Sequence, residues 1–295
     1  MAENMDMNMN NNMNYAPQYV PAPEQKKSGG WAWLVVVLLG VALLVLGIIL
    51  YNVNDRDKYF KTKDIHETYS VSDIDDIKMD MPFADLTIEK SKDNMIHIDA
   101  VGVPEQFNSK AENGKFTTSF KKKKIGLLTV HDFFSYDENK SKITIALPDK
   151  EYKNFDLSLG AGETSIGDLE CGFFNIDCGA GEITFKNISC ESGDIDCGAG
   201  ELNISDMNCK GELKIDGGAG EVTIIDTTLG GLDLDHGVGE FTFTGTINGD
   251  IDADGGVGEM SINLTNPESD FSKNGGKYKL DVDHGIGSAN VTYNN

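Results

Sequence analysis

A four-residue motif, Gly-x-Gly-Glu, recurs along the second half of this 295-residue chain at a nearly constant interval. A degraded seventh copy, Gly285-Ile286-Gly287-Ser288, follows the sixth copy after a longer interval. A fixed short period predicts a solenoid, in which each repeat forms one coil stacked on the previous coil. The glutamates that end the six copies, and whose numbers give the period, are Glu163, Glu182, Glu201, Glu221, Glu240 and Glu259.

The repeat has the pattern of strands, as the copy at 194–205 shows. Apolar and polar residues alternate on both sides of its glycine pair, which is the signature of half-buried strands. One period is too short for a strand and a crossover helix, so each coil should hold two or three short strands. Glycine would permit a positive φ at the corner between them. We expect Ile195, Cys197, Leu202 and Ile204 to point inward and Asp196 and Glu201 outward.

The predicted fold is therefore all-β: a parallel β-solenoid of about 19-residue coils over 65–295, with regular repeats from 156 to 294. An earlier segment resembles a worn copy, with Phe83-Ala84-Asp85 in place of the motif. The strand-like runs 95–100 and 142–147 fit either irregular early coils or a capping sheet.

Residues 31–51 contain no charged side chain and would span about 31 Å as a helix, which is enough to cross the hydrocarbon core of a bilayer. Trp31, Trp33 and Tyr51 lie at its ends, where aromatic belts occur. The run is too long for a signal peptide, and no small-residue cleavage site follows it. We predict one transmembrane helix over 31–51, after a disordered tail over 1–30 and before a linker over 52–64.

The orientation of this anchor depends on two opposing signals. More basic residues follow the helix than precede it, which by itself favours an N-terminus outside. A long domain after a single N-terminal anchor is usually translocated regardless of charge. We expect a cell-membrane protein with a cytoplasmic N-terminus and an extracytoplasmic solenoid.

The net charge of −23 belongs mostly to the repeats, since residues 151–295 hold 27 acidic side chains and 7 lysines. Binding to nucleic acid needs a basic footprint, so this composition excludes it for the repeat region. The one arginine of the chain, Arg56, lies outside the repeats. A basic run, 121–124, is most simply a solvated turn, with contact to anionic lipid or wall polymer as the alternative.

Outward carboxylates should form two rows along the solenoid. Neighbours within a row would lie about 4.8 Å apart at the backbone and repel one another. Such rows are either solvated or neutralised by cations, and calcium accepts oxygen ligands of this kind. We expect a solvated acidic face, with calcium as the alternative. The candidate ligands are Glu182, Glu201, Glu221 and Glu240 in one row and Asp177, Asp196, Asp216 and Asp235 in the other.

The five cysteines follow the repeat, at 171, 190 and 209 and at 178 and 197. We interpret them as small hydrophobic side chains in two core columns, although disulfides between adjacent rungs are geometrically allowed. No Cys-x-x-Cys pair indicates zinc. His236 and His284 occupy the inward position of Cys178 and are expected to fill the core.

No motif in the chain predicts catalysis. The acidic residues follow the repeat and do not cluster at one rung, and there is no nucleophile elbow, phosphate-binding loop or His-Glu-x-x-His sequence. We expect no catalytic residues and no cofactor. A polysaccharide-acting β-helix enzyme and a calcium-binding adhesin remain the alternative functions.

Two segments before the first corner resemble a bacterial family: Ile143-Thr144-Ile145-Ala146-Leu147-Pro148, and then Tyr152-Lys153-Asn154-Phe155-Asp156-Leu157-Ser158-Leu159-Gly160-Ala161-Gly162. With the coils that follow, they are similar to the "putative adhesin" β-strand-repeat domain of unknown function found in Lia-type cell-envelope stress proteins. The resemblance covers about residues 65–295. It implies a membrane-tethered, extracytoplasmic, non-catalytic module that binds, senses or serves as structure at the envelope and acts in the stress response. Its partners would be the bilayer, through 31–51, and an envelope polymer or membrane protein.

Overall fold

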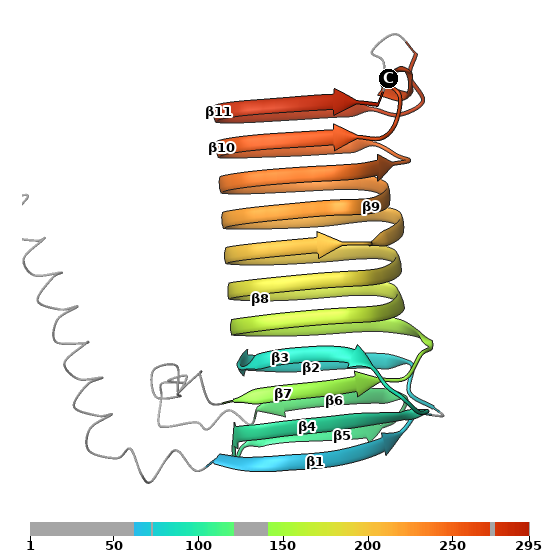
Figure 1. Ribbon diagram of the computed structural model, residues 1–295, viewed down its shortest axis with the longest axis vertical. Helices are drawn as coiled ribbons and strands as arrows, with labels where there is room; N and C mark the ends of the chain where they lie inside the picture. The colour runs from blue at the N-terminus through green and yellow to red at the C-terminus, as the bar shows by residue number, and fades with distance from the viewer. Residues whose placement is uncertain (1–61, 72, 121–140, 272–274, 295) are drawn as a thin grey trace, which may run out of the picture. The chain divides into compact units, whose positions relative to one another are not determined.

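The computed structural model describes residues 62–71, 73–120, 141–271 and 275–294 of the chain, all of which belong to one compact unit, Asp55–Asn295 (Figure 1). These residues are almost entirely β-structure, as expected. No helix among them is long and apolar enough to cross a membrane, and the helix predicted at 31–51 lies outside them. The elements are β1 (Thr62–Ser70), β2 (Asp76–Phe83), β3 (Asp85–Lys90), β4 (Met95–Pro104), β5 (Phe107–Glu112), β6 (Lys115–Phe120), β7 (Lys142–Leu147), β8 (Glu151–Ser205), β9 (Asn208–Ile247), β10 (Ile251–Leu264), η2 (Glu268–Phe271) and β11 (Leu280–Tyr293).

The predicted parallel solenoid is confirmed from β8 to β11 (Figure 1). Each coil pairs in register with the equivalent positions of the next coil, so that Ile195 lies beside Ile215 and Glu240 beside Glu259. The last coil pairs across a longer stretch of sequence, with Gly258 beside Gly287, because the segment that contains η2 is inserted before β11.

The strands differ from the short segments that we expected. β8 continues for 55 residues and β9 for 40 without a break, because the corners bend the chain while the ladder of hydrogen bonds continues. The second glycine of each motif has a positive φ, for example 125° at Gly200, and a Cβ placed there would collide with the carbonyl oxygen of Gly181 on the adjacent rung. Glycine is therefore required at this corner for both its backbone conformation and its lack of a side chain.

A second corner in each of the first four regular coils is made without glycine. Asp168, Asn187, Asp206 and Asp226 all adopt a positive φ between 52° and 56°, the left-handed conformation that Asp and Asn tolerate best among non-glycine residues. The Asn187 amide donates a hydrogen bond to the Asp168 carboxylate one rung away. The Gly-x-Gly-Glu motif does not predict this corner, although the corner residues recur at nearly the same period.

The core confirms the predicted register. Ile195, Leu202 and Ile204 are fully buried, Asp196 and Glu201 are exposed, and Cys197 is partly buried. Rings stack between coils, since Phe155 and Phe174 lie parallel with centroids 5.7 Å apart. Equivalent apolar side chains of successive coils therefore stack on one another and form one continuous core, as the repeat predicts.

The worn copy at Phe83-Ala84-Asp85 is the coil next to the first regular one. β2 and β3 pair in parallel with β8, and Leu86 lies beside Thr164. Beyond this coil the pairing changes, because β4 runs antiparallel to both β1 and β7. The run 95–100 thus belongs to a capping sheet, the second of our two alternatives. The run 142–147 pairs in parallel with β3 on one side and antiparallel with β4 on the other, so it is an irregular early coil that joins the stack to this sheet.

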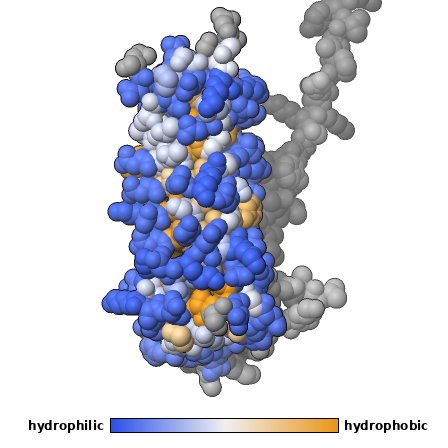
Figure 2. Space-filling view, turned by 90° about the vertical axis from the view of Figure 1, so that its right-hand side faces the viewer, coloured by the Kyte–Doolittle hydropathy of each residue, from blue (hydrophilic) through white to orange (hydrophobic). Residues whose placement is uncertain are grey.

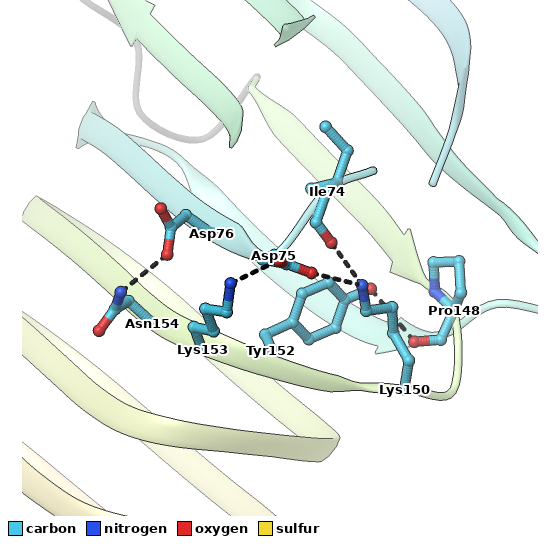
Figure 3. Close-up of polar contacts among 8 residues, drawn as sticks. All are labelled: Ile74, Asp75, Asp76, Pro148, Lys150, Tyr152, Lys153 and Asn154. Atoms are coloured by element: carbon cyan, nitrogen blue, oxygen red, sulfur yellow. Dashed lines mark hydrogen bonds and ion pairs between the residues drawn. The ribbon is translucent and has the colours of Figure 1, made fainter. Parts of the chain in front are cut away.

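A polar junction joins this first part to the regular coils (Figure 3). Lys153 Nζ lies 2.8 Å from Asp75 Oδ2, and Lys150 Nζ donates to the Ile74 carbonyl oxygen at 2.6 Å and to Asp75 Oδ1 at 3.3 Å. The Asn154 amide donates to Asp76 Oδ1 at 2.7 Å. Hydrogen bonds from Lys153 and Lys150 lower the pKa of Asp75. The segment that carries the family resemblance therefore connects β2 to the start of β8.

Candidate functional site

The predicted Asp row forms a column on the outer face of the segments that precede the glycine corners. Asp196 lies beside Asp216, and Asp254 lies between Asp235 and Asp283. Backbones of neighbouring members are about 4.8 Å apart, as in any sheet. The structure thus brings the sequence-predicted aspartates together along one face.

A second acidic column, which our sequence analysis did not single out, runs beside the first. It lies two residues earlier on each strand, and Asp252 pairs there with both Asp233 and Asp281. Lys214 occupies the same column beside Asp194, and its Nζ lies 3.0 Å from Asp216 Oδ2. Lys279 lies 3.1 Å from Asp281. The signal was present in the sequence, because outward residues on one strand must recur at every second position.

The two acidic columns together form what we call the aspartate face, and the pKa of two of its members is raised by desolvation and by neighbouring carboxylates. Partial desolvation and then repulsion from Asp177, Asp216 and Asp194 raise the pKa of Asp196. Desolvation, followed by the charges of neighbours such as Asp252, likewise raises the pKa of Asp254. The aspartate face therefore holds uncompensated negative charge that a cation or a basic partner would relieve.

The predicted Glu row lies on the other side of the glycine corner. Glu201 pairs with Glu221, and Glu240 pairs with Glu259. Leu86 pairs in parallel with Thr164, so the residues that precede them, Asp85 and Glu163, are neighbours as well. Asp85 therefore continues the Glu row into the preceding coil. In Figure 2, hydrophilic side chains cover most of the face in view, and apolar residues appear between them in an interrupted strip.

At the N-terminal end of the Glu row, a lysine lies beside the carboxylates. Lys142 pairs with Asp85, and together with Glu163 and Glu182 they line a hollow of about 380 Å³. Hydroxyl groups complete the wall, so this hollow could bind a small polar group through hydrogen bonds. The hydroxyl-bearing residues that line it are Thr87, Thr144, Ser165 and Thr184.

No three His, Cys, Asp or Glu side chains converge on a point where a metal ion could sit, within the part of the chain that the structure describes. The carboxylates of both rows follow the rungs one by one. A solvated acidic face stays the prediction for the two rows, and calcium binding stays its alternative.

The cysteines occupy two interior columns, as predicted, and all five thiols are free. Cys190 pairs in register with Cys209. The hydrogen bond to Cys209 and burial raise the pKa of Cys190, and burial raises the pKa of Cys171 to about 12. Cys171 and Cys190 therefore stay protonated at neutral pH and pack as small apolar side chains.

The two histidines share the column of Cys178 and Cys197. His236 is only 4% exposed, and burial lowers the pKa of its imidazole. His284, in the last rung, is partly exposed, and its Nε2 lies 3.0 Å from the carbonyl oxygen of Gly258. Their predicted role as core fillers is confirmed for His236 and holds in part for His284, which has no rung above it in the described stack.

Comparisons with solved structures find distantly similar proteins. A putative cell adhesion protein from Clostridium sporogenes is 15% identical, with a TM-score of 0.34, and the match covers 79% of this chain and 99% of that one. A putative adhesin from Bacteroides fragilis is 15% identical with a TM-score of 0.41, covering 79% and 98%. A putative lipid binding protein from Parabacteroides distasonis is 16% identical with a TM-score of 0.36, covering 78% and 96%.

A search of curated proteins finds no match. The family model described as Toastrack DUF4097 matches residues 74–291, which include β2 to β10 and most of β11. This match confirms the resemblance to a putative-adhesin repeat domain. The chain belongs to the Toastrack family, DUF4097.

Proposed function

We propose that this chain is a single-pass membrane protein of the bacterial cell envelope, whose extracytoplasmic solenoid is a non-catalytic binding module. The observation that supports a binding role most is the aspartate face, which continues from rung to rung and, among the described residues, is offset mainly by Lys214 and Lys279. The carboxylates of the regular coils follow the repeat rung by rung, which favours a binding module over a polysaccharide-cleaving enzyme.

The partner that this face suits is positively charged, such as a basic segment of a membrane protein or an amine-bearing envelope polymer. Electrostatic complementarity of this kind increases the rate of association and is weakened by salt. The carboxylates repeat about every 4.8 Å along the stack, so an extended partner could contact several rungs at once. The family resemblance favours a role for such binding in the envelope stress response.

Binding can be tested with a lysine-rich peptide and an acidic peptide of equal length. The lysine-rich peptide should bind, with an affinity that falls as salt is raised, and the variant Asp196→Asn, Asp216→Asn, Asp235→Asn should bind it more weakly. The matched variant Glu201→Gln, Glu221→Gln, Glu240→Gln removes the same number of negative charges from the Glu row. It should bind the lysine-rich peptide as the parent chain does if the aspartate face is the binding site. Equal loss in both variants would mean that only net charge matters.

Topology has its own test, because it depends on the predicted anchor at 31–51. Protease added to intact cells should remove residues beyond 60 and leave the N-terminal tail protected. A solenoid that survives this treatment but is cut after lysis would invert the topology, and the envelope-binding role would then be abandoned.

A further inference from the structure

The last strand of the stack has an open edge. Within the described residues, β11 pairs only with β10, so one row of its backbone N–H and C=O groups points away from the sheet. Val282, His284 and Val291 are only partly buried, whereas Ala253 and Ile262 in the rung beneath are fully buried. Natural sheets and solenoids cover edges of this kind, because an open edge is a template for pairing with another chain.

The two ends of the stack are built differently. At the first end, β1 and β4 run antiparallel and close the core over Ile65, Ile96 and Ile98, which are all buried. At the last end, Phe271 from η2 packs against Tyr278 and Tyr293 and covers one side of the rung. The half of β11 around its glycine corner has no such cover in the described residues. We call this half, Val282–Val291, the terminal edge.

The terminal edge also lacks the motif glutamate that every regular rung carries. Ser288 takes the place of the motif glutamate and pairs with Glu259. The next outward residues after the corner, Asn290 and Thr292, are neutral as well, so Asp281 and Asp283 before the corner are the only carboxylates of β11.

An apolar ridge leads to this edge. The residue between the two corner glycines is alanine in the first four regular copies, but then becomes Val238, Val257 and Ile286, which pair in register. Their exposed fractions are 53%, 44% and 71%. At this corner position, larger apolar side chains are thus exposed only in the three rungs nearest the end.

We propose that the terminal edge pairs with the same edge of a second copy of this chain, antiparallel, about a two-fold axis at the corner beside Ile286. A two-fold interface brings the segment before one corner against the segment after the other. Inward positions of one copy must lie opposite inward positions of the other, and outward positions opposite outward positions. Val282 then lies opposite the partner's Ala289, and Asp283 lies opposite the partner's Ser288. Aspartates therefore face neutral hydrogen-bonding residues, and the two apolar ridges become continuous.

The alternative arrangement for a second copy is less favourable. A parallel coil stacked on β11 would place its own carboxylates directly above Asp281 and Asp283, as within the solenoid. The first end of another copy cannot supply such a coil either, because it is closed by the antiparallel strands β1 and β4. The loss of glutamate in this one rung is explained by the two-fold pairing, in which a glutamate at 288 would face an aspartate. This proposal does not depend on the binding role proposed above.

Cross-linking tests the position of the axis. In Ile286→Cys the two new thiols would lie next to each other across the axis, so mild oxidation of the purified full chain in detergent should give a covalent dimer. Ala199→Cys is the matched control, because Ala199 is the exposed corner residue of an internal rung. The five native thiols are shared by both variants. If Ile286→Cys gives no more dimer than Ala199→Cys, the proposal is wrong.

A charge variant tests the interface without a new thiol. Ser288→Glu restores the motif of the other rungs and should leave folding intact, but it places two symmetry-related glutamates opposite aspartates. We expect the dimer dissociation constant to rise about tenfold, and more at low salt, since each like-charge cross-strand contact weakens pairing a few-fold. Thr242→Glu adds the same charge to an internal rung and should leave the constant unchanged. A chain that sediments as a monomer at all concentrations, or equal effects of both variants, would overturn the proposal.

Discussion

The imidazole of His236 occupies the space that Gly217 leaves empty one rung away. A Cβ placed on Gly217 would lie only 2.6 Å from His236 Nδ1. The same relationship recurs at the end of the stack, where a Cβ on Gly255 would collide with His284 Nδ1. Glycine and histidine thus alternate in a column that holds cysteine in earlier rungs, and a residue without a side chain compensates for a large neighbour.

Gly217→Ala should therefore destabilise the fold by about 1 to 3 kcal/mol, the usual cost of overpacking a core. The double variant Gly217→Ala, His236→Cys should recover part of this loss, because cysteine fills the same position in two earlier rungs. Urea unfolding of a 60–295 fragment measures both. Additive effects of the two substitutions would show that these residues do not compete for space.

Burial of His236 predicts a pH dependence of stability. Because burial lowers the pKa of this imidazole in the folded state, its contribution to stability is fully present above the unfolded pKa of about 6.5 and is lost as pH falls below it. The melting temperature should fall between pH 7 and pH 5 more steeply in the parent chain than in His236→Cys. His66→Gln, at an exposed histidine, should retain the parent slope.

The register of the coils can be tested at one rung. Ile204→Asp places an unpaired charge in the core and should cost several kcal/mol, or prevent folding. Asp196→Asn should be neutral or slightly stabilising, because repulsion from neighbouring aspartates is removed. Chemical denaturation of both variants gives the comparison. A stable Ile204→Asp protein would contradict the observed register.

The carboxylate rows predict a response to ions. Monovalent salt at about 0.15 M should relieve only part of the repulsion, because screening then acts over about 8 Å, which is longer than the spacing between rungs. If the rows are simply solvated, millimolar calcium and magnesium should raise the melting temperature equally. A rise of several degrees with calcium alone would show a specific site, since calcium accepts more and looser oxygen ligands than magnesium.

The periodic part of this protein could be read from its sequence. Alternation of apolar and polar residues determines which face each side chain takes, and the constant repeat length determines which side chains become neighbours. The burial of Ile195 and Ile204, the exposure of Asp196 and Glu201 and the two columns of thiols all followed from these two periods. They are local properties, so no knowledge of distant contacts was needed.

The tertiary structure decided what the repeat does not encode. The ion pair between Lys153 and Asp75 joins residues 78 positions apart, and Lys142 meets the Glu row only because β7 lies beside β3. Which part of β11 is covered likewise depends on where η2 packs in the folded stack. Segments without a period can pair in many ways, and the burial of their apolar faces in the assembled stack selects one of them.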